Sequence, residues 1–299
     1  MNNGKITFRN FWPGNDITKY FIYDLLESAN LRKKNIIVTS VFNSSSLAKK
    51  AIYYYKNKLG LPITINEYLA TMYKIHQPVL KKDTLNVWYT GENLRPPPDD
   101  GWDLILSFET SKISSRHVHL PFWATRLGVN IKDAQINQKK FLENRFFKDH
   151  RQNFACAVFN NPEPTRLKAI KDISQIMKVD LYGSIFGKHI QDKIKVLSNY
   201  NFSVCFENDL YPGYITEKVF EAWTAGTVPI WWGIDNTGIL NKNAIINFAE
   251  GDFNSNIVNL EEILSNSNLL LGMRNEPLLN FEYDYDELFN SVQTILCNL

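Results

Sequence analysis

The 299-residue sequence has only three cysteines, Cys156, Cys205 and Cys297. They stand far apart, without the spacing of metal ligands, and two of them lie in apolar, strand-like runs. The sequence therefore predicts buried free thiols in place of disulfides. That pattern is typical of proteins that work in a reducing compartment.

The sequence also lacks an excess of charge of one sign and any long apolar run. Its 33 lysines and arginines are balanced by 31 aspartates and glutamates, which excludes recruitment of nucleic acid by bulk charge. No run approaches the length of a membrane-spanning helix, and the first residues, MNNGKITFRNFW, contain no signal-peptide core. We expect a soluble, cytoplasmic protein with no nucleic-acid partner.

The sequence does have enough apolar residues for a full core, since 44% of its residues are hydrophobic and 13% are aromatic. Strand-like and helix-like stretches alternate twice, before and after a polar, helical connector near residues 132–149. Such alternation with short connections predicts mostly parallel sheets wrapped by helices. Two sets predict two Rossmann-like domains. The expected strands are 5–8, 35–42, 84–89, 104–108, 155–159, 179–182, 202–206, 227–232 and 244–248, and the expected helices 16–29, 47–58, 164–177, 216–225, 258–265 and 286–295.

The most informative stretch is residues 202–233, FSVCFENDLYPGYITEKVFEAWTAGTVPIWWG. It predicts a strand, a polar loop, a helix that Thr216 caps and Gly226 ends, and a second buried strand. A loop between a strand's carboxyl end and a helix's amino end is where open α/β sheets bind nucleotides. Lys218 adds a cation there and Glu217 a hydroxyl acceptor, which suits a diphosphate and a sugar hydroxyl. The alternative is an ordinary surface helix cap with a solvated Glu-Lys pair.

A carboxylate follows an expected strand of the first half. Glu92 comes directly after residues 84–89 and Thr90-Gly91, so it lies at the carboxyl edge of a parallel sheet. Partial desolvation at that edge would raise the pKa of Glu92 and make it a better base. The residues alone leave a solvated turn residue as the alternative.

An arginine follows the first strand of the second half. Asn160-Asn161-Pro162 ends that strand, and Arg166 lies in the first turn of the helix that Pro164 opens. An arginine can hold two phosphate oxygens with its fixed fork, which suits a pyrophosphate that gains charge as a bond breaks. Without further information, a solvated helix arginine is the simpler interpretation.

Together these segments resemble the bacterial-type α-1,3/4-fucosyltransferases of glycosyltransferase family ten. FEN, YxTEK and VPIxWG recur in family order and spacing at residues 206–208, 214–218 and 228–233. YTGEN at 89–93 resembles the segment whose glutamate is the family's general base. The family's SNP-then-R segment resembles residues 160–166, with Asn160 where serine is commoner. The likeness covers most of the chain in order and is loosest in the first half.

The resemblance implies an α/β fold of GT-B architecture, with two Rossmann-like domains facing across a cleft. Residues 1–140 would bind the acceptor and residues 141–281 the donor GDP-fucose. Residues 282–299 would form a C-terminal helix that packs back toward the first domain. The second domain would thus hold the nucleotide.

The implied reaction is an inverting transfer of L-fucose from GDP-fucose. The acceptor would be the 3-hydroxyl, or the 4-hydroxyl, of N-acetylglucosamine in an N-acetyllactosamine-type glycan, giving Lewis-type structures. Glu92 is the implied general base. Glu207 can equally be a structural carboxylate that accepts N–H bonds from its loop. The implied donor-binding residues are Asn160, Asn161, Arg166, Glu207, Asn208, Tyr214, Thr216, Glu217 and Lys218.

We expect no required cofactor and no metal ligands. Asp284-Tyr285-Asp286 has the Asp-X-Asp pattern of metal-dependent transferases, but it stands at the start of the last expected helix, where acidic side chains stabilise the dipole. Lys218 and Arg166 would supply the positive charge, so that a divalent metal at most stimulates the reaction.

The expected partners are GDP-fucose and an oligosaccharide acceptor. A monomer is favoured, and peripheral contact with a membrane through a glycolipid acceptor stays open. Two alternatives remain: a GT-B enzyme that uses another nucleotide sugar, and a non-catalytic homologue that binds glycan or nucleotide.

Overall fold

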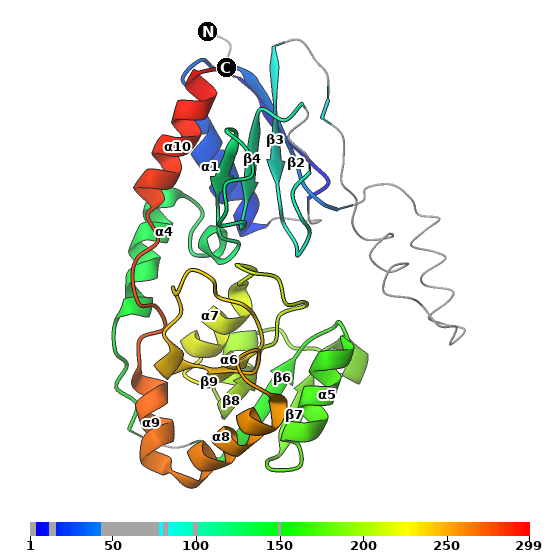
Figure 1. The fold of residues 1–299 in the computed structure, drawn as a ribbon, viewed down its shortest axis with the longest axis vertical. Helices are drawn as coiled ribbons and strands as arrows, with labels where there is room; N and C mark the ends of the chain where they lie inside the picture. Colours follow the sequence, from blue (N-terminus) through cyan, green and yellow to red (C-terminus); the bar gives the residue numbers. More distant parts are fainter. Residues whose placement is uncertain (1–3, 12–15, 43–77, 80–82, 98–100, 149–150) are drawn as a thin grey trace, which may run out of the picture. The chain divides into compact units, whose positions relative to one another are not determined.

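The computed structural model describes residues 4–11, 16–42, 78–79, 83–97, 101–148 and 151–299 (Figure 1). The helix expected at 47–58 lies outside the described residues. The chain divides into two compact units. Unit 1 contains Met1–Leu120, Gly128–Asp133 and Asp284–Leu299, and unit 2 contains Pro121–Leu127 and Ala134–Tyr283. The sequence interpretation had set the two changes of domain at 140/141 and 281/282.

Unit 1 is built on a parallel five-stranded sheet in the order β1-β2-β3-β4-β5. Its three central strands are apolar and buried along most of their length, which is typical of a parallel sheet covered on both faces. Among the described strands of this unit, the spatial order follows the chain order. The strands are β1 (Ile6–Arg9), β2 (Asn35–Thr39), β3 (Thr84–Tyr89), β4 (Leu104–Ser107) and β5 (His117–His119).

Two helices from opposite ends of the chain pack together in unit 1, α1 (Ile17–Ala29) and α10 (Tyr285–Cys297) (Figure 1). Phe21 of α1 meets the buried ring of Tyr285 with 6.0 Å between ring centroids. The Nζ of Lys34 donates to the carbonyl oxygen of Leu299 at 2.9 Å. The last helix therefore completes the first unit.

Unit 2 contains the second parallel sheet, in the order β10-β9-β8-β6-β7. The connector to it, α4 (Ile131–Gln138) and η2 (Lys139–Leu142), is shorter than the helix expected to residue 149. Helix α9 was not expected. The elements are β6 (Asn153–Val158), α5 (Pro164–Ile173), β7 (Val179–Tyr182), η3 (Ser184–Phe186), α6 (Lys193–Leu197), β8 (Tyr200–Val204), α7 (Glu217–Thr224), β9 (Val228–Trp231), η4 (Lys242–Ala244), β10 (Ile246–Asn247), α8 (Phe253–Ser265) and α9 (Ser267–Asn275).

The strand order of unit 2 reverses at β6. From β6 the chain passes through α5 to β7 on one side, and then returns through α6 to β8 on the other side. Ligands of open α/β sheets bind outside the carboxyl ends of the strands at such a switch point, because the connecting loops diverge there. The topology thus directs attention to the loops that follow β6 and β8.

The cysteines are free, as the sequence predicts. Cys156 and Cys205 are buried, and burial raises the pKa of the Cys156 thiol to about 12. No helix among the described residues combines the length and hydropathy that crossing a membrane requires.

Candidate functional site

Helix α7 begins directly after the polar loop that follows β8. The hydroxyl of Thr216 accepts the backbone N–H of Lys218 at 3.4 Å, which confirms the predicted cap. Glu217 lies in the first turn, where a carboxylate suits the positive end of the helix dipole. The helix stops before Gly226, whose φ of 77° is the left-handed value that glycine adopts without strain.

The carboxylate of Glu207 is fully buried and joins β8, α7 and β9. Its Oε1 accepts the backbone N–H of Thr216 at 2.9 Å and the indole N–H of Trp231 at 3.2 Å. Its Oε2 accepts the hydroxyl of Thr216 at 2.8 Å and the ammonium of Lys218 at 2.9 Å. These partners offset the cost of burying the charge. They are the contacts of a structural carboxylate, one of the two roles that the sequence left open.

The first turn of α7 carries two charges that reinforce each other. Burial alone would lower the pKa of Lys218, but Glu207 and Glu217 outweigh it and raise that pKa above its ordinary value. Burial alone would raise the pKa of Glu217, but the cations around it, Lys218 first and Arg126 next, lower it. Lys218 keeps a side-chain exposure of 20%. The turn therefore presents a partly accessible ammonium beside a carboxylate at neutral pH.

Two further cations lie near this turn, and the sequence interpretation did not assign them to the site. Arg126 ends η1 (Trp123–Arg126), and its guanidinium lies 5.2 Å from the centre of the Phe122 ring. Lys193 opens α6 and pairs with Glu221 at 2.5 Å. The sequence shows no periodicity or composition change to indicate that residues 121–127 belong to unit 2.

Arg166 is only 2% exposed and joins the loops after β6 and β8. Its Nη1 donates to the carbonyl oxygen of Asn161 at 2.7 Å. Its Nη2 donates to the carbonyl oxygen of Phe206 at 2.9 Å and to Oδ1 of Asn208 at 3.1 Å. Burial lowers the pKa of Arg166, while the carboxylate of Glu163 acts against that shift. The interpretation of Arg166 as a solvated helix arginine is therefore wrong. Its direct contact with a phosphate stays a prediction.

Asn160 connects the loops after β6 and β7. Its Oδ1 accepts both the backbone N–H of Ser184 at 2.7 Å and the Ser184 hydroxyl at 2.8 Å. Gly183, the residue before Ser184, has a φ of 133°. A Cβ at this position would come within 2.0 Å of the carbonyl oxygen of Phe159. Asn160, Asn161, Arg166 and Asn208 thus lie at the switch point, but their contact with the donor stays a prediction.

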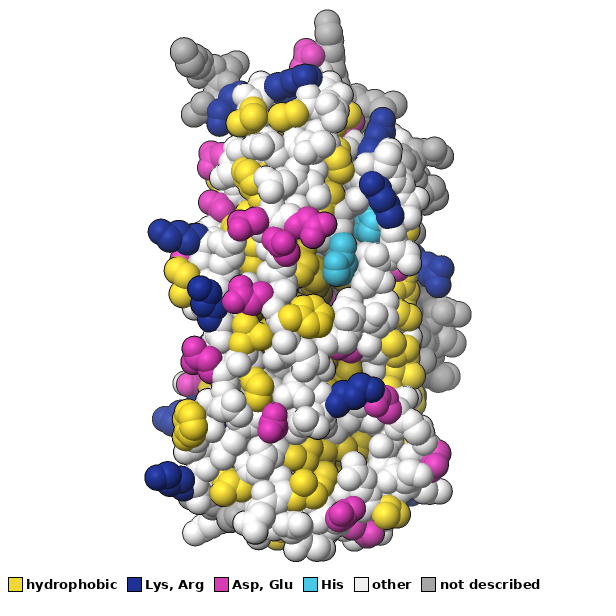
Figure 2. Space-filling view, turned by 60° about the vertical axis from the view of Figure 1, so that its left-hand side comes forward, with side chains coloured by type: hydrophobic (Ala, Val, Ile, Leu, Met, Phe, Trp, Pro, Cys, Tyr) yellow, Lys and Arg dark blue, Asp and Glu magenta, His cyan; other side chains and the backbone are white. Residues whose placement is uncertain are grey.

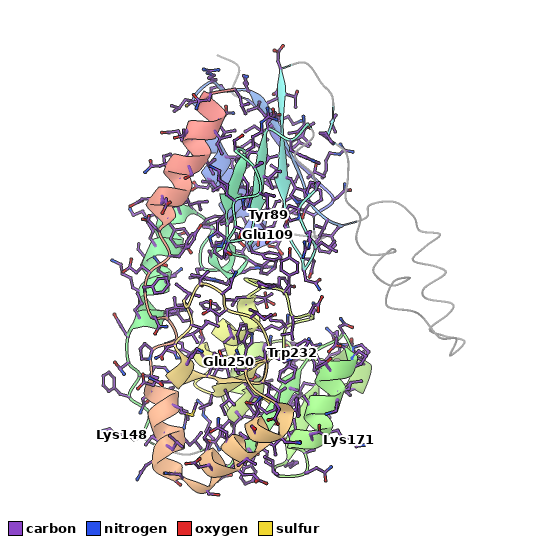
Figure 3. All side chains as sticks on the ribbon, viewed as in Figure 1. Tyr89, Glu109, Lys148, Lys171, Trp232 and Glu250 are labelled. Atoms are coloured by element: carbon purple, nitrogen blue, oxygen red, sulfur yellow. The ribbon has the colours of Figure 1, made fainter. Side chains whose placement is uncertain are left out.

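Tyr214 is buried in unit 2, with a relative exposure of 1%. Its ring contacts the ring of Phe122 edge-on, with 6.2 Å between the ring centroids. The carbonyl oxygen of the neighbouring Ile215 accepts the backbone N–H of Trp123 at 3.2 Å. The donor contact that the family resemblance implies for Tyr214 stays a prediction. Trp232 is partly buried and stacks on Phe206 at 5.9 Å, beside the end of β9 (Figure 3).

Glu92 belongs to unit 1 and follows the central strand β3, as the sequence predicts. It is 9% exposed, and its carbonyl oxygen accepts the backbone N–H of Leu94 at 2.7 Å. The next strand, β4, is followed by a second carboxylate, Glu109 (Figure 3). The sequence interpretation missed Glu109, although it too follows directly after an expected strand. The role of Glu92 as a base stays a prediction.

The Asp-X-Asp pattern begins α10, as expected. The carboxylate of Asp284 accepts the backbone N–H of Glu287 at 2.8 Å, so it caps the helix. Figure 2 shows acidic side chains gathered beside histidines, and Asp284, Asp286 and Glu287 line a groove of unit 1 together with His117. Among the described residues, no three His, Cys, Asp or Glu side chains lie where they could hold a metal ion.

The match to a known protein family lies in unit 2. Residues 148–267 match the family model for the C-terminal part of glycosyltransferase family 10 (fucosyltransferase). The α-(1,3)-fucosyltransferase FucT of Helicobacter pylori is 27% identical over 226 residues, 65% of this chain and 47% of the relative. Human 4-galactosyl-N-acetylglucosaminide 3-α-L-fucosyltransferase 9 is 36% identical over 87 residues, 28% of this chain and 24% of the relative. The chain thus spans about half, or less, of the curated relatives it matches.

Solved structures extend the likeness of fold to nearly the whole chain. A crystal structure of an α1,3-fucosyltransferase with GDP-fucose aligns with a TM-score of 0.67 at 19% identity, covering 98% of this chain and 90% of that one. Two parallel sheets, the second with a charged helix start at its switch point, define a glycosyltransferase fold of the GT-B class. Within that class, the chain is similar to the fucosyltransferases of glycosyltransferase family 10, whose family model matches residues 148–267.

Proposed function

We propose that this protein transfers L-fucose from GDP-fucose to a hydroxyl of an oligosaccharide, with inversion at the fucose C1. The observation that supports this most directly is the start of α7 at the switch point of unit 2. There Lys218, Glu217 and the Thr216 cap combine the positive end of a helix dipole, a cation and a hydroxyl acceptor. That combination suits a nucleotide diphosphate with a sugar attached.

In the proposed reaction the acceptor oxygen attacks C1 of fucose while the bond from C1 to the phosphate oxygen breaks. The acceptor's proton passes to a carboxylate, for which we propose Glu92 at the end of β3. The departing GDP gains negative charge, which Lys218 stabilises because its pKa is raised and it is protonated at neutral pH. Positive side chains supply this stabilisation, so the proposal includes no required metal.

The proposed acceptor position is the 3-hydroxyl of an N-acetylglucosamine that carries a galactose. The names of two relatives support it: the human protein is a 4-galactosyl-N-acetylglucosaminide 3-α-L-fucosyltransferase and the bacterial one an α-(1,3)-fucosyltransferase. Transfer to the 4-hydroxyl would use the same attack and the same base. The difference lies in how the acceptor is oriented.

A panel of donors and acceptors tests this proposal. The purified protein is incubated with GDP-fucose and either lactose, N-acetyllactosamine or a chitin oligomer, and GDP release is followed with and without acceptor. We expect acceptor-dependent release with N-acetyllactosamine, and a product whose linkage NMR identifies as α-1,3. Transfer from another nucleotide sugar in its place would indicate a different GT-B activity. GDP binding without transfer to any acceptor would indicate a non-catalytic homologue.

A further inference from the structure

We propose that Glu207 is a positioning residue: it holds the ammonium of Lys218 at the first turn of α7 and does not itself bind the donor. This inference rests on the proposed function, because it concerns how the same site holds GDP. Three features of the structure carry it: the occupation of both carboxylate oxygens, the complete burial of Glu207, and the partial exposure of Lys218.

Both oxygens of Glu207 already have two donors each from within the protein. The backbone N–H of Thr216 and the indole of Trp231 bind Oε1, at 2.9 and 3.2 Å. The hydroxyl of Thr216 and the ammonium of Lys218 bind Oε2, at 2.8 and 2.9 Å. Because the carboxylate has a relative exposure of 0%, a sugar hydroxyl could bind it only after one of these donors has left.

Lys218 is the member of this group that remains accessible. Its side chain is 20% exposed, while Thr216 is 2% exposed and Trp231 fully buried. An ammonium has three N–H donors, and those of Lys218 face Glu207 at 2.9 Å and the Thr216 hydroxyl at 3.3 Å. A flexible four-carbon side chain loses rotamer freedom when it binds an anion, so a carboxylate that fixes it beforehand improves affinity.

The rest of the scaffold fixes Glu207 in turn. Trp231 lies in β9, and a Cβ at Gly233 would come within 2.2 Å of its ring, so the chain passes closely against the indole. Arg166 donates to the backbone carbonyl of Glu207 at 3.2 Å and to Oδ1 of Asn208 at 3.1 Å. Glu207 is therefore held through its carboxylate by β9 and the start of α7, and through its backbone carbonyl by Arg166 of α5, as a preorganised site requires.

Glu207→Gln is the informative substitution, because it should remove the ion pair with Lys218 and leave the hydrogen bonds to Thr216 and Trp231 that stabilise the start of the helix. The amide oxygen can still accept the two N–H donors now bound to Oε1. The amide nitrogen would then face Thr216 and Lys218, and it cannot accept from an ammonium. We therefore expect the variant to keep the cap and release Lys218. Trp231→Phe is a second variant, which removes only the indole N–H donor, and Glu250→Gln is the matched control, because Glu250 pairs with the exposed Lys242 at 2.9 Å.

The test is a double-mutant cycle in which calorimetry measures GDP binding to the folded proteins. We expect Glu207→Gln and Lys218→Met each to weaken binding by about tenfold or more, and the double variant to bind like Lys218→Met alone. Trp231→Phe should weaken binding by a few fold, with no further loss once Lys218 is methionine. The control Glu250→Gln should bind GDP like the wild type. The variants should also lower kcat with GDP-fucose, because the ammonium faces charge that develops on the leaving group.

The other outcomes each overturn the inference. If the effects of Glu207→Gln and Lys218→Met simply multiply, Glu207 contacts the donor directly. A lower melting temperature with unchanged GDP affinity would mean that the carboxylate only stabilises the fold. If Glu207→Gln does not fold, the cycle of Trp231→Phe with Lys218→Met decides by the same criterion. A wild-type protein that binds no GDP would instead refute the proposed function, and this inference with it.

Discussion

The Nη1 of Arg166 donates to the carbonyl oxygen of Asn161 at 2.7 Å, so the arginine closes the loop that leads into its own helix. Its other terminal nitrogen reaches the loop after β8. The two loops at the switch point of unit 2 are therefore held at a fixed spacing by one planar group. A side chain without the fork of a guanidinium cannot reach both of them.

Arg166→Lys should consequently destabilise unit 2 although it preserves the charge. Carbonyl oxygens now bound by the guanidinium would lose a donor in a buried setting, which lowers the free energy of unfolding by about 2–4 kcal/mol. GDP affinity should fall as well. Urea unfolding and calorimetry measure the two effects. Lys168→Ala on the same helix, whose side chain is 67% exposed, should stay within about 0.5 kcal/mol. Equal stability of both variants would contradict this role for Arg166.

Gly183→Ala is expected to disrupt the junction between the loops after β6 and β7. Its φ of 133° is nearly restricted to glycine, and the new Cβ would lie 2.0 Å from a backbone oxygen. We expect a loss of about 3 kcal/mol or more in the free energy of unfolding. Gly187→Ala is the control, because its φ is 65° and nothing lies within 4 Å of its Cβ position. That variant should lose only about 1 kcal/mol, and a similar loss in both would refute the steric argument.

Much of unit 2 could be predicted because its signals are local. The cap at Thr216, the stop at Gly226 and the strands on either side follow from residues close together in the chain. The short strands and α9 were missed or misplaced by a few residues, since tertiary contacts decide where such elements end. The switch point itself needs the order of strands in space, which no short window of sequence contains.

The candidate site was less predictable than the fold, for a physical reason. Sequence places Arg166, Glu207 and Lys218 at the right loops, but it does not show which polar atoms bind one another. The structure reveals that Arg166 and Glu207 are buried and hydrogen-bonded within the protein, while Lys218 stays partly exposed. Residue type and spacing are the same for a side chain that binds a ligand and for one that stabilises a loop, so the sequence cannot distinguish the two roles.

The stability of unit 1 should depend on pH through His119. Burial, with a smaller contribution from His117, lowers the pKa of His119 from 6.5 to about 4. The unfolded chain therefore binds the proton first, and stability that is complete above about pH 6.5 is lost as the pH falls toward about 4. The loss should amount to about 2–3 kcal/mol. Hydrogen exchange of β4 and β5 measures it for this unit alone.

The control for this titration is a histidine of unit 2. His119→Gln should reduce the difference in exchange between about pH 7 and about pH 5, because one of the two histidines of β5 no longer takes up a proton, while His117, whose pKa burial also lowers, remains. His189→Gln, at an exposed position, should leave the difference as it is in the wild type. An unchanged pH dependence in His119→Gln would show that another group is responsible.

Glu92→Gln tests the proposed base against the second carboxylate at the same edge of the sheet. A glutamine at the end of β3 cannot take the acceptor's proton, so we expect turnover with GDP-fucose to fall by about 10²-fold or more. GDP affinity should be unchanged, because the proposed donor-binding residues belong to unit 2. Glu109→Gln makes the same change in charge at the end of β4, and its turnover should stay within about threefold of the wild type. If Glu109→Gln abolishes transfer and Glu92→Gln does not, then Glu109 is the base, since both carboxylates follow neighbouring parallel strands and only one can accept the proton from the attacking oxygen.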